Sequence, residues 1–129
     1  MIAIDTNIIV RFLTADDPVQ FKKARALFQK ENIFIPSTVV LETEWVLSYA
    51  YKVKPSDIIT ALSSLFGLPN VEVEDPLTIA DAFEWYKKGM DYADAIHLAK
   101  SRGSERFVTF DKKLIIQARK FTDIIADKP

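Results

Sequence analysis

Short apolar runs alternate along the chain with longer segments in which apolar and polar positions are mixed. The runs at 1–4, 33–35, 71–73 and 106–110 have the length of strands, with 71–73 as a weak edge strand, and 124–125 is a candidate for a last short one. Strands separated by helix-length segments are typical of an α/β fold with a parallel sheet. We therefore expect a mainly parallel sheet with helices between its strands.

The longer segments have apolar residues at helical spacing. Asp17 followed by Pro18 is a helix start signal, Ser37 is a candidate cap for the third helix, and Gly89 and Gly103 are expected to end two others. In the second helix, Val19 should lie on the inner side with Ala24, Leu27 and Phe28. The predicted helices cover 6–14, 18–30, 55–67, 76–88, 91–101 and 112–120, and the third helix follows its cap Ser37 and carries apolar residues as far as Tyr49.

Size and composition predict one folded domain over residues 1–129, since hydrophobic residues make up 49 % of the chain. The chain has no cysteine and one histidine, His97, which excludes disulfides, Cys-ligated zinc and sites built from several imidazoles. A metal site would therefore use oxygen ligands, which favours Mg²⁺, with Mn²⁺ as the other candidate.

Charge and hydropathy set further expectations. The formal net charge is −1, which is not the signature of a nucleic-acid-binding protein. Removing the four candidate acids described below would leave +3, so the charge is compatible with RNA binding but does not support it. No apolar run has membrane-spanning length and no basic leader precedes the first strand, so we expect a cytoplasmic protein without a membrane partner.

Two acidic residues directly follow predicted strands. Asp5 ends the first apolar run and Asp111 ends the run at 106–110. Ligands of open parallel sheets bind at the carboxyl ends of the strands, so both carboxylates are candidate functional groups. Each could instead simply cap the helix that follows, since Asp is a common N-cap residue.

Two further acids lie within predicted helices. Glu42 and Glu44 are about 200° apart around the third helix, so they cannot share a site, and periodicity does not choose between them. Asp91, Asp94 and His97 share one face of the helix at 91–101, where two acids in the first turn could also just complement the helix dipole. Asp94, flanked by alanines, is expected to be the more buried of the two.

Carboxylates that converge in a crevice repel one another, and a divalent cation removes that cost. Mg²⁺ binds few protein carboxylates and keeps several waters. Such a cation lowers the pKa of a bound water, and a second one can stabilise the leaving oxygen in phosphodiester hydrolysis. The residue types present suit this chemistry without any histidine or cysteine. Whether one or two ions would bind stays open.

Four segments together resemble the motifs of PIN-domain proteins, especially the VapC toxins of prokaryotic toxin–antitoxin pairs. They run in family order from the first residues to about Leu114, and each is weak alone but specific in combination. The segments are Met1-Ile2-Ala3-Ile4-Asp5-Thr6-Asn7, Val40-Leu41-Glu42-Thr43-Glu44-Trp45-Val46-Leu47, Asp91-Tyr92-Ala93-Asp94-Ala95-Ile96-His97-Leu98-Ala99 and Val108-Thr109-Phe110-Asp111.

The resemblance implies a three-layer α/β/α sandwich with a short, mainly parallel central sheet. It also implies an Mg²⁺-dependent endoribonuclease that acts as a toxin on cellular RNA such as tRNA or rRNA, with a homodimeric state and a cognate antitoxin. By the same resemblance Asp5, Glu42, Asp94 and Asp111 are the catalytic, metal-binding acids, with Asp111 expected to matter least, and Glu42 is chosen over Glu44. Supporting roles fall to Thr6, to Asn7 as the residue that orients Asp5, to Thr109 as a hydrogen-bonding group and to Asp91 as an outer-shell group.

Other candidates have ordinary explanations as well. Arg11 lies one turn after Asn7 and could contact a phosphate, or could be a surface residue. Lys112 and Lys113 could contact RNA, although charged residues at a helix start usually face water. His97 is expected to be a structural helix residue. The aromatic residues at helical spacing are expected to be core or dimer contacts, with base stacking as the weaker interpretation; they are Trp45, Phe83, Trp85 and Tyr86.

Four other functions compete with a toxin. A PIN ribonuclease of RNA processing would share all its motifs. A haloacid-dehalogenase-like phosphohydrolase also has an Asp after its first strand but needs a second Asp two residues later, where this chain has Asn7. A non-enzymatic receiver-like domain needs paired acids after strand one, where this chain has Asp5 followed by Thr6. A PIN fold used only for binding would not need four acids.

Overall fold

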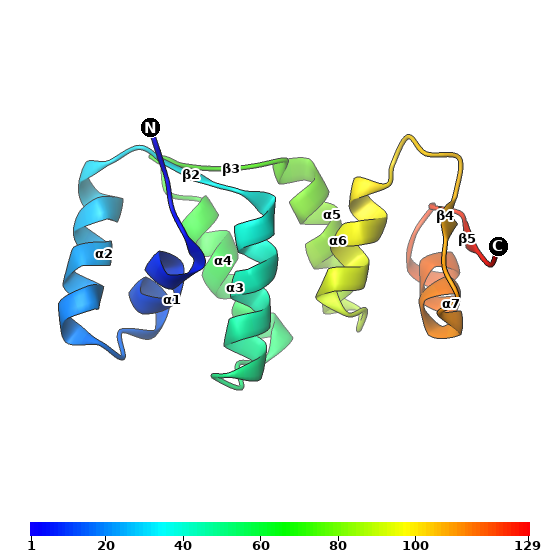
Figure 1. The fold of residues 1–129 in the computed structure, drawn as a ribbon, viewed down its shortest axis with the longest axis horizontal. Helices are drawn as coiled ribbons and strands as arrows, with labels where there is room; N and C mark the ends of the chain where they lie inside the picture. Colours follow the sequence, from blue (N-terminus) through cyan, green and yellow to red (C-terminus); the bar gives the residue numbers. More distant parts are fainter. The chain divides into compact units, whose positions relative to one another are not determined.

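A computed structural model describes all residues, 1–129, as seven helices and two sets of parallel strands (Figure 1). The chain forms two compact units, Met1–Asp75 and Pro76–Pro129. Helices and strands follow one another in the predicted order. The first unit contains three strands and four helices, and the second contains three helices and a two-stranded ladder.

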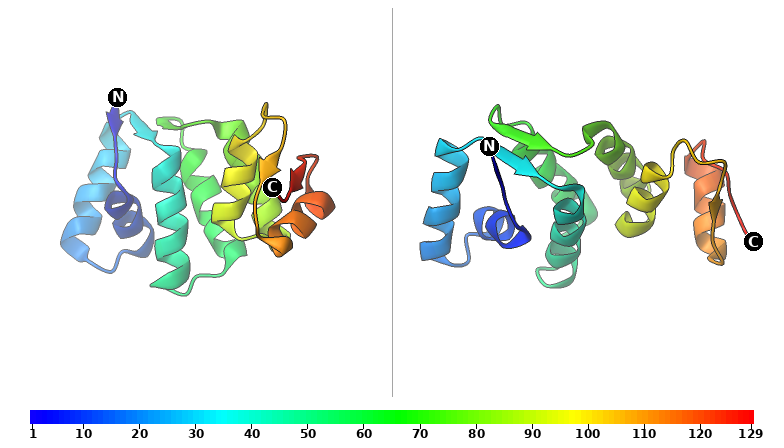
Figure 2. Two further views of the ribbon diagram at one scale, coloured as in Figure 1. Left: turned by 45° about the vertical axis from the view of Figure 1, so that its right-hand side comes forward. Right: turned by 45° about the horizontal axis from the view of Figure 1, so that its top comes forward.

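The first unit is built on a three-stranded parallel sheet. Strand β1 (Ile2–Ala3) pairs with β2 (Ile33–Ile35), which pairs with β3 (Val71–Val73). The arrows of β2 and β3 are seen in the right-hand view of Figure 2. The central strand is the most buried, with Ile33 and Ile35 fully covered. Because all three strands are parallel, the segments that follow them leave from one edge of the sheet.

Four helices belong to this unit: α1 (Thr6–Thr14), α2 (Pro18–Lys30), α3 (Ser37–Tyr49) and α4 (Pro55–Phe66). Helix α1 packs against both α2 and α3, and α4 packs against α3 and β3. The sequence starts α2 as predicted, since the Asp17 side chain accepts hydrogen bonds from the N–H groups of Val19 and Gln20 and Pro18 stands at the first position. The core of the unit contains fully buried residues of α1, α3 and α4, namely Ile9, Val40, Ile58 and Leu62.

The second unit begins with a pair of packed helices, α5 (Pro76–Lys87) and α6 (Tyr92–Lys100), which lie side by side in Figure 1. Gly89 stands between them with φ +111°, a conformation that favours glycine, and ends α5 as predicted. Strand β4 (Phe107–Val108), α7 (Lys112–Phe121) and β5 (Ala126–Asp127) follow, with β5 packed against α7 and β4.

Several local predictions were wrong. The strand predicted at 106–110 is limited to Phe107–Val108, because the chain turns where the Thr109 hydroxyl accepts the Asp111 N–H, and Phe110 is left exposed. The last strand lies at Ala126–Asp127 instead of 124–125, in the register that places Phe107 opposite Ala126.

Two predictions about helices were also wrong. Ser37 does not cap α3; it is the first helical residue, and its N–H and hydroxyl groups both donate to the Glu74 carboxylate after β3. Val19 is exposed, because it lies in the first turn of α2, outside the buried stretch around Ala24 and Phe28. None of the seven helices has the length and apolar character that crossing a membrane requires.

Candidate metal-binding site

Asp5 lies at the junction between β1 and α1. The strand pairing continues to Ile4, whose N–H donates to the Phe34 carbonyl at 3.3 Å, and the Ile4 side chain is buried. Asp5 then caps α1, with its Oδ1 accepting the Thr6 N–H at 2.6 Å. The carboxylate is exposed, and Oδ2 has no hydrogen-bond partner within the chain. The capping interpretation is therefore correct, and it leaves one carboxylate oxygen available to a ligand.

Glu42 and Glu44 have opposite environments on α3. Glu42 is exposed, whereas the side chain of Glu44 is buried in the unit, with 8 % of the residue exposed. Helix α3 begins two residues after β2, the strand beside β1, so its first turns start at the same edge of the sheet as Asp5. Glu42 stands five residues into this helix, about 7.5 Å along its axis from Ser37. This placement makes Glu42 the solvent-accessible acid of the pair.

Two threonines next to these acids have unpaired hydroxyl groups. Thr6 follows Asp5 and Thr43 follows Glu42, and in both the Oγ1 atom is buried without a hydrogen-bond partner. A buried hydroxyl without a partner carries a desolvation cost. A bound water or ligand atom at either position would remove that cost.

Asp94 lies in the first turn of α6, half-buried among the small side chains around it. Its pKa is raised, mainly because burial disfavours the charged form and further because Asp91 and Asp111 repel it, while His97 and Lys113 act in the opposite direction. Two acids of the second unit, Asp91 and Asp111, therefore lie near enough to Asp94 to disfavour its charged form. The exposed His97 lies near enough to Asp94 to stabilise its charge.

Asp91 and Asp111 are both helix caps in the second unit. Asp91 caps α6 by accepting the Asp94 N–H at 3.1 Å, and Asp111 caps α7 by accepting the Leu114 N–H at 3.1 Å. The Thr109 hydroxyl accepts the Asp111 N–H at 3.0 Å, which fixes the backbone just before the cap. The second carboxylate oxygen of Asp111 has no partner within the chain. Asp111 therefore resembles Asp5 in capping a helix with one oxygen, although Asp5 accepts the N–H of the first helical residue and Asp111 that of the third.

The predicted acids divide evenly between the units. Asp5 and Glu42 belong to Met1–Asp75, and Asp94 and Asp111 belong to Pro76–Pro129. Within neither unit do three histidine, aspartate or glutamate side chains form an arrangement that could hold a metal ion. The convergence of all four acids therefore stays a prediction from the sequence. The donor chemistry fits a hard cation, because exposed or half-buried carboxylates with free oxygens are what Mg²⁺ binds.

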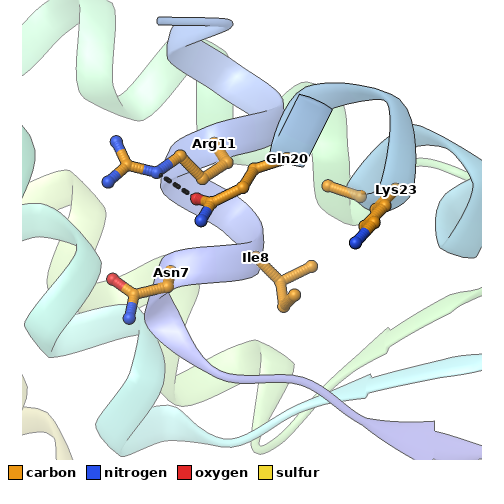
Figure 3. Close-up of a pocket in the computed structure, with 6 residues that line it drawn as sticks. Asn7, Ile8, Arg11, Gln20 and Lys23 are labelled. Atoms are coloured by element: carbon orange, nitrogen blue, oxygen red, sulfur yellow. Dashed lines mark hydrogen bonds between the residues drawn. The ribbon is translucent and has the colours of Figure 1, made fainter. Parts of the chain in front are cut away.

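Asn7 forms no hydrogen bond with the Asp5 carboxylate. The Asp5 side chain accepts its hydrogen bond from Thr6, and Asn7 instead lines a pocket between α1 and α2 (Figure 3). Arg11 lines the same pocket and forms a salt bridge with Asp16 at 3.0 Å. Gln20, which lines this pocket from α2, was not singled out in the sequence, and neither was Glu74, which accepts the hydrogen bonds of Ser37 at the start of α3. Only the position of Glu74 directly after a strand, like that of Asp5, could have drawn attention to it.

The aromatic residues separate into two groups. Phe83, Trp85 and Tyr86 are buried in the second unit, which confirms their expected place in the core. Trp45 is 58 % exposed and stacks on Tyr49 with ring centroids 5.2 Å apart, so it is not a core residue of its unit.

Comparison with known proteins gives one family. The sequence profile of the PIN domain matches residues 2–120, which cover both units and all four candidate acids. No curated protein matches the chain.

Proposed function

The chain belongs to the PIN-domain family, whose members are typically metal-dependent nucleases, and on that premise we propose that it is an Mg²⁺-dependent endoribonuclease acting as the toxin of a toxin–antitoxin pair. We further propose that residues 1–129 act as one PIN domain, with Asp5, Glu42, Asp94 and Asp111 as its metal ligands. The fold class agrees with this family, since seven helices and a short parallel sheet of three strands are consistent with a three-layer α/β/α arrangement.

The observation that carries the proposal is the repeated strand–cap–helix junction. Asp5 and Asp111 each follow a parallel strand, each cap a helix with one oxygen, and each leave the other oxygen free. The cap fixes the orientation of the carboxylate, so the free oxygen is presented to a cation without a further loss of side-chain freedom. Glu42 and Asp94 each add one accessible carboxylate from a helix in the same units.

The repulsion of Asp94 by Asp91 and Asp111 adds a second argument. Neighbouring carboxylates are costly unless a cation offsets their charge. Mg²⁺, when bound, supplies that charge and activates water for attack on a phosphodiester. The four carboxylates would hold the ion, and no residue would need to act as a general base. The exposed His97 is therefore not assigned a catalytic role.

The test is cleavage of total cellular RNA by the purified protein with Mg²⁺, with Mn²⁺ and with EDTA. An Asp94→Asn variant tests the proposed site, and Glu84→Gln, at an exposed position of α5 in the same unit, is the matched control. We expect cleavage by the wild type and the control, and none with EDTA or in the Asp94→Asn variant. Cleavage that persists in that variant would contradict the assignment.

Failure to cleave total RNA calls for a second readout, because a toxin can have a narrow target. Isothermal titration with Mn²⁺ measures binding independently of any substrate. Binding to the wild type and not to Asp94→Asn would keep the metal site in place, whereas absence of binding to either protein would overturn the enzyme proposal.

The toxin role has its own experiment. Induced expression should arrest growth and the Asp94→Asn variant should not, whereas a PIN ribonuclease of RNA processing would leave growth unaffected.

The proposed homodimer is checked by light scattering, since one chain has a mass of 14.7 kDa. The haloacid-dehalogenase alternative predicts a phosphorylated Asp5, which intact mass spectrometry after incubation with a phosphoryl donor would detect.

A further inference from the structure

A pocket of about 350 Å³ lies between α2 and α1, the helix that Asp5 caps. Figure 3 shows that Asn7 and Arg11 enter it from α1, whereas Gln20 and Lys23 come from α2. All four of these side chains can donate hydrogen bonds and none is acidic. Ile8 and Ala24 complete the lining. The pocket therefore has the donor chemistry of an anion site.

The Arg11 guanidinium is held in one orientation by its neighbours. Its Nε donates to Gln20 Oε1 at 2.7 Å, and its Nη1 donates to both oxygens of Asp16 at 3.0 Å and to the Tyr51 hydroxyl at 3.2 Å. Nη2 has no partner within the chain. A fixed guanidinium with one free edge is well suited to a phosphate oxygen, because little side-chain freedom is lost on binding.

Asp16 and Tyr51 hold the Arg11 guanidinium in this orientation. The Tyr51 hydroxyl donates to Asp16 Oδ2 at 2.6 Å, and the Thr14 hydroxyl donates to Asp16 Oδ1 at 2.9 Å. These two hydrogen bonds, with Arg11 beside them, lower the pKa of Asp16 to about 2, so this support is charged at neutral pH. Asp16 also offsets part of the charge of Arg11. Lys23 has no ion-pair partner and supplies the net positive charge of the pocket.

The position of the pocket relates it to the proposed metal site. Asn7 and Arg11 are two and six residues after Asp5 on the same helix, about 3 and 9 Å along its axis. A nucleic-acid strand with one phosphate near Asp5 would carry further phosphates past this helix. We propose that the pocket binds a phosphate of the RNA strand next to the one that is cleaved, with Arg11 and Lys23 as phosphate ligands and Asp16 and Tyr51 as positioning residues. This inference rests on the proposed ribonuclease function.

The alternative is a purely structural role, in which the hydrogen bonds among Arg11, Asp16 and Tyr51 only join the turn between α1 and α2 to the segment that follows α3. A structural clasp of this kind needs Arg11, Asp16 and Tyr51 but gives no role to Lys23, which forms no hydrogen bond or ion pair with them. A substitution of Lys23 therefore distinguishes a phosphate-binding site from a purely structural clasp.

The test measures RNA binding by fluorescence anisotropy, with a labelled single-stranded oligoribonucleotide of mixed sequence as the probe. All proteins carry Asp94→Asn so that the probe is not cut. Lys23→Ala is compared with Lys22→Ala, which removes the same charge from a neighbouring exposed position of α2 outside the pocket. We expect Lys23→Ala to reduce the slope of log Kd against log salt concentration by about 0.7, the value for one lost phosphate contact on a single strand. Lys22→Ala should leave the slope unchanged.

Tyr51→Phe tests the positioning role. It removes the hydroxyl contacts to Arg11 and Asp16 without changing the charge, so Kd should rise while the salt slope stays the same. A fall in Tm with an unchanged Kd would show a structural clasp only.

Equal slopes in Lys23→Ala and Lys22→Ala would overturn the phosphate site, because α2 would then contribute only diffuse charge. This experiment does not depend on cleavage. A slope change in these variants together with no RNA cleavage by the wild-type protein would retain the phosphate site and remove the ribonuclease. Cleavage by the wild-type protein without the slope change would do the reverse.

Discussion

Asp5 and Asp111 occupy the same kind of junction in two differently built units. Both follow a parallel strand and cap the next helix. Before Asp5, the strand belongs to a three-stranded sheet and ends in the buried Ile4. Before Asp111, a two-stranded ladder is followed by the turn at Thr109 and by Phe110, which is 82 % exposed.

This difference concerns how firmly each carboxylate is supported. The Asp5 backbone continues from a sheet whose central strand buries Ile33 and Ile35 completely, so displacing it would disturb the core. The Asp111 backbone depends on one hydroxyl contact and on its own cap. We therefore expect the Asp5 junction to be the more rigid one, which agrees with the expectation from the sequence that Asp111 matters less for activity.

The largest expected effect is a difference in RNA cleavage between the variants Asp5→Asn and Asp111→Asn. Asparagine is as good an N-cap as aspartate, so both variants should fold and lose only the charged ligand. Asp5→Asn should lower RNA cleavage at least about 100-fold, and Asp111→Asn about 10-fold, within the range for groups that support a metal site. Cleavage rates on one RNA substrate under saturating Mg²⁺ measure both. Equal losses would show that the two junctions contribute equally.

Substitutions in the three-stranded sheet and in the β4–β5 ladder should differ in their effect on the free energy of unfolding. Ile33→Ala removes a fully buried side chain from the central strand and should lower the free energy of unfolding by about 2–5 kcal/mol. Val108→Ala, in the exposed ladder before Asp111, should change it by less than about 0.5 kcal/mol. Urea unfolding followed by circular dichroism measures both. A large effect of Val108→Ala would mean that the ladder is covered in solution.

The start of α3 offers a third comparison, because this helix has no cap of its own, whereas α6 and α7 begin with Asp91 and Asp111. Glu74→Ala removes the acceptor of two hydrogen bonds from Ser37 and should cost about 2 kcal/mol of stability, as expected for bonds to a charged group. Glu72→Ala, at an exposed position of β3, is the control and should change the stability by less than about 0.5 kcal/mol. A Glu74→Ala variant as stable as this control would show that α3 begins without tertiary support.

The smallest expected effect on stability concerns the exposed salt bridges of two arginines. Arg11 pairs with Asp16 in the first unit, and Arg102 pairs with Asp81 and Asp123 in the second. The folded-state pKa of Asp16 is lowered to about 2, so its charged form stabilises the fold above the ordinary value near 4, and this contribution is lost as the pH falls through about 2.

The Tm difference between the wild type and Asp16→Asn should therefore be present at pH 7 and disappear as the pH approaches 2. Thermal melts across this pH range measure it. The pKa of Asp123 is lowered mainly by its hydrogen bonds from Arg102, so Asp123→Asn should show the same direction. A difference that grows toward acid would contradict the assigned shifts.

Much of the fold followed from local spacing. The apolar runs and the helical periodicity between them predicted the element order, and Asp17 with Pro18 and Gly89 predicted where individual helices begin and end. The same local information placed Asp5 and Asp111 directly before helices, because an acidic residue after a strand and before an amphipathic segment is both a cap and a candidate ligand.

Other features depended on contacts between residues far apart in the chain. Glu74 stabilises the start of α3 from 37 residues away, and Tyr51 contacts Arg11 across 40 residues. The choice between Glu42 and Glu44 also had no local signal, because both occupy the same kind of sequence, and only packing made one exposed and the other buried. Periodicity records which face of a helix is apolar, but the partner of a polar group is chosen by tertiary structure, since hydrogen bonds depend on distances in space and not along the chain.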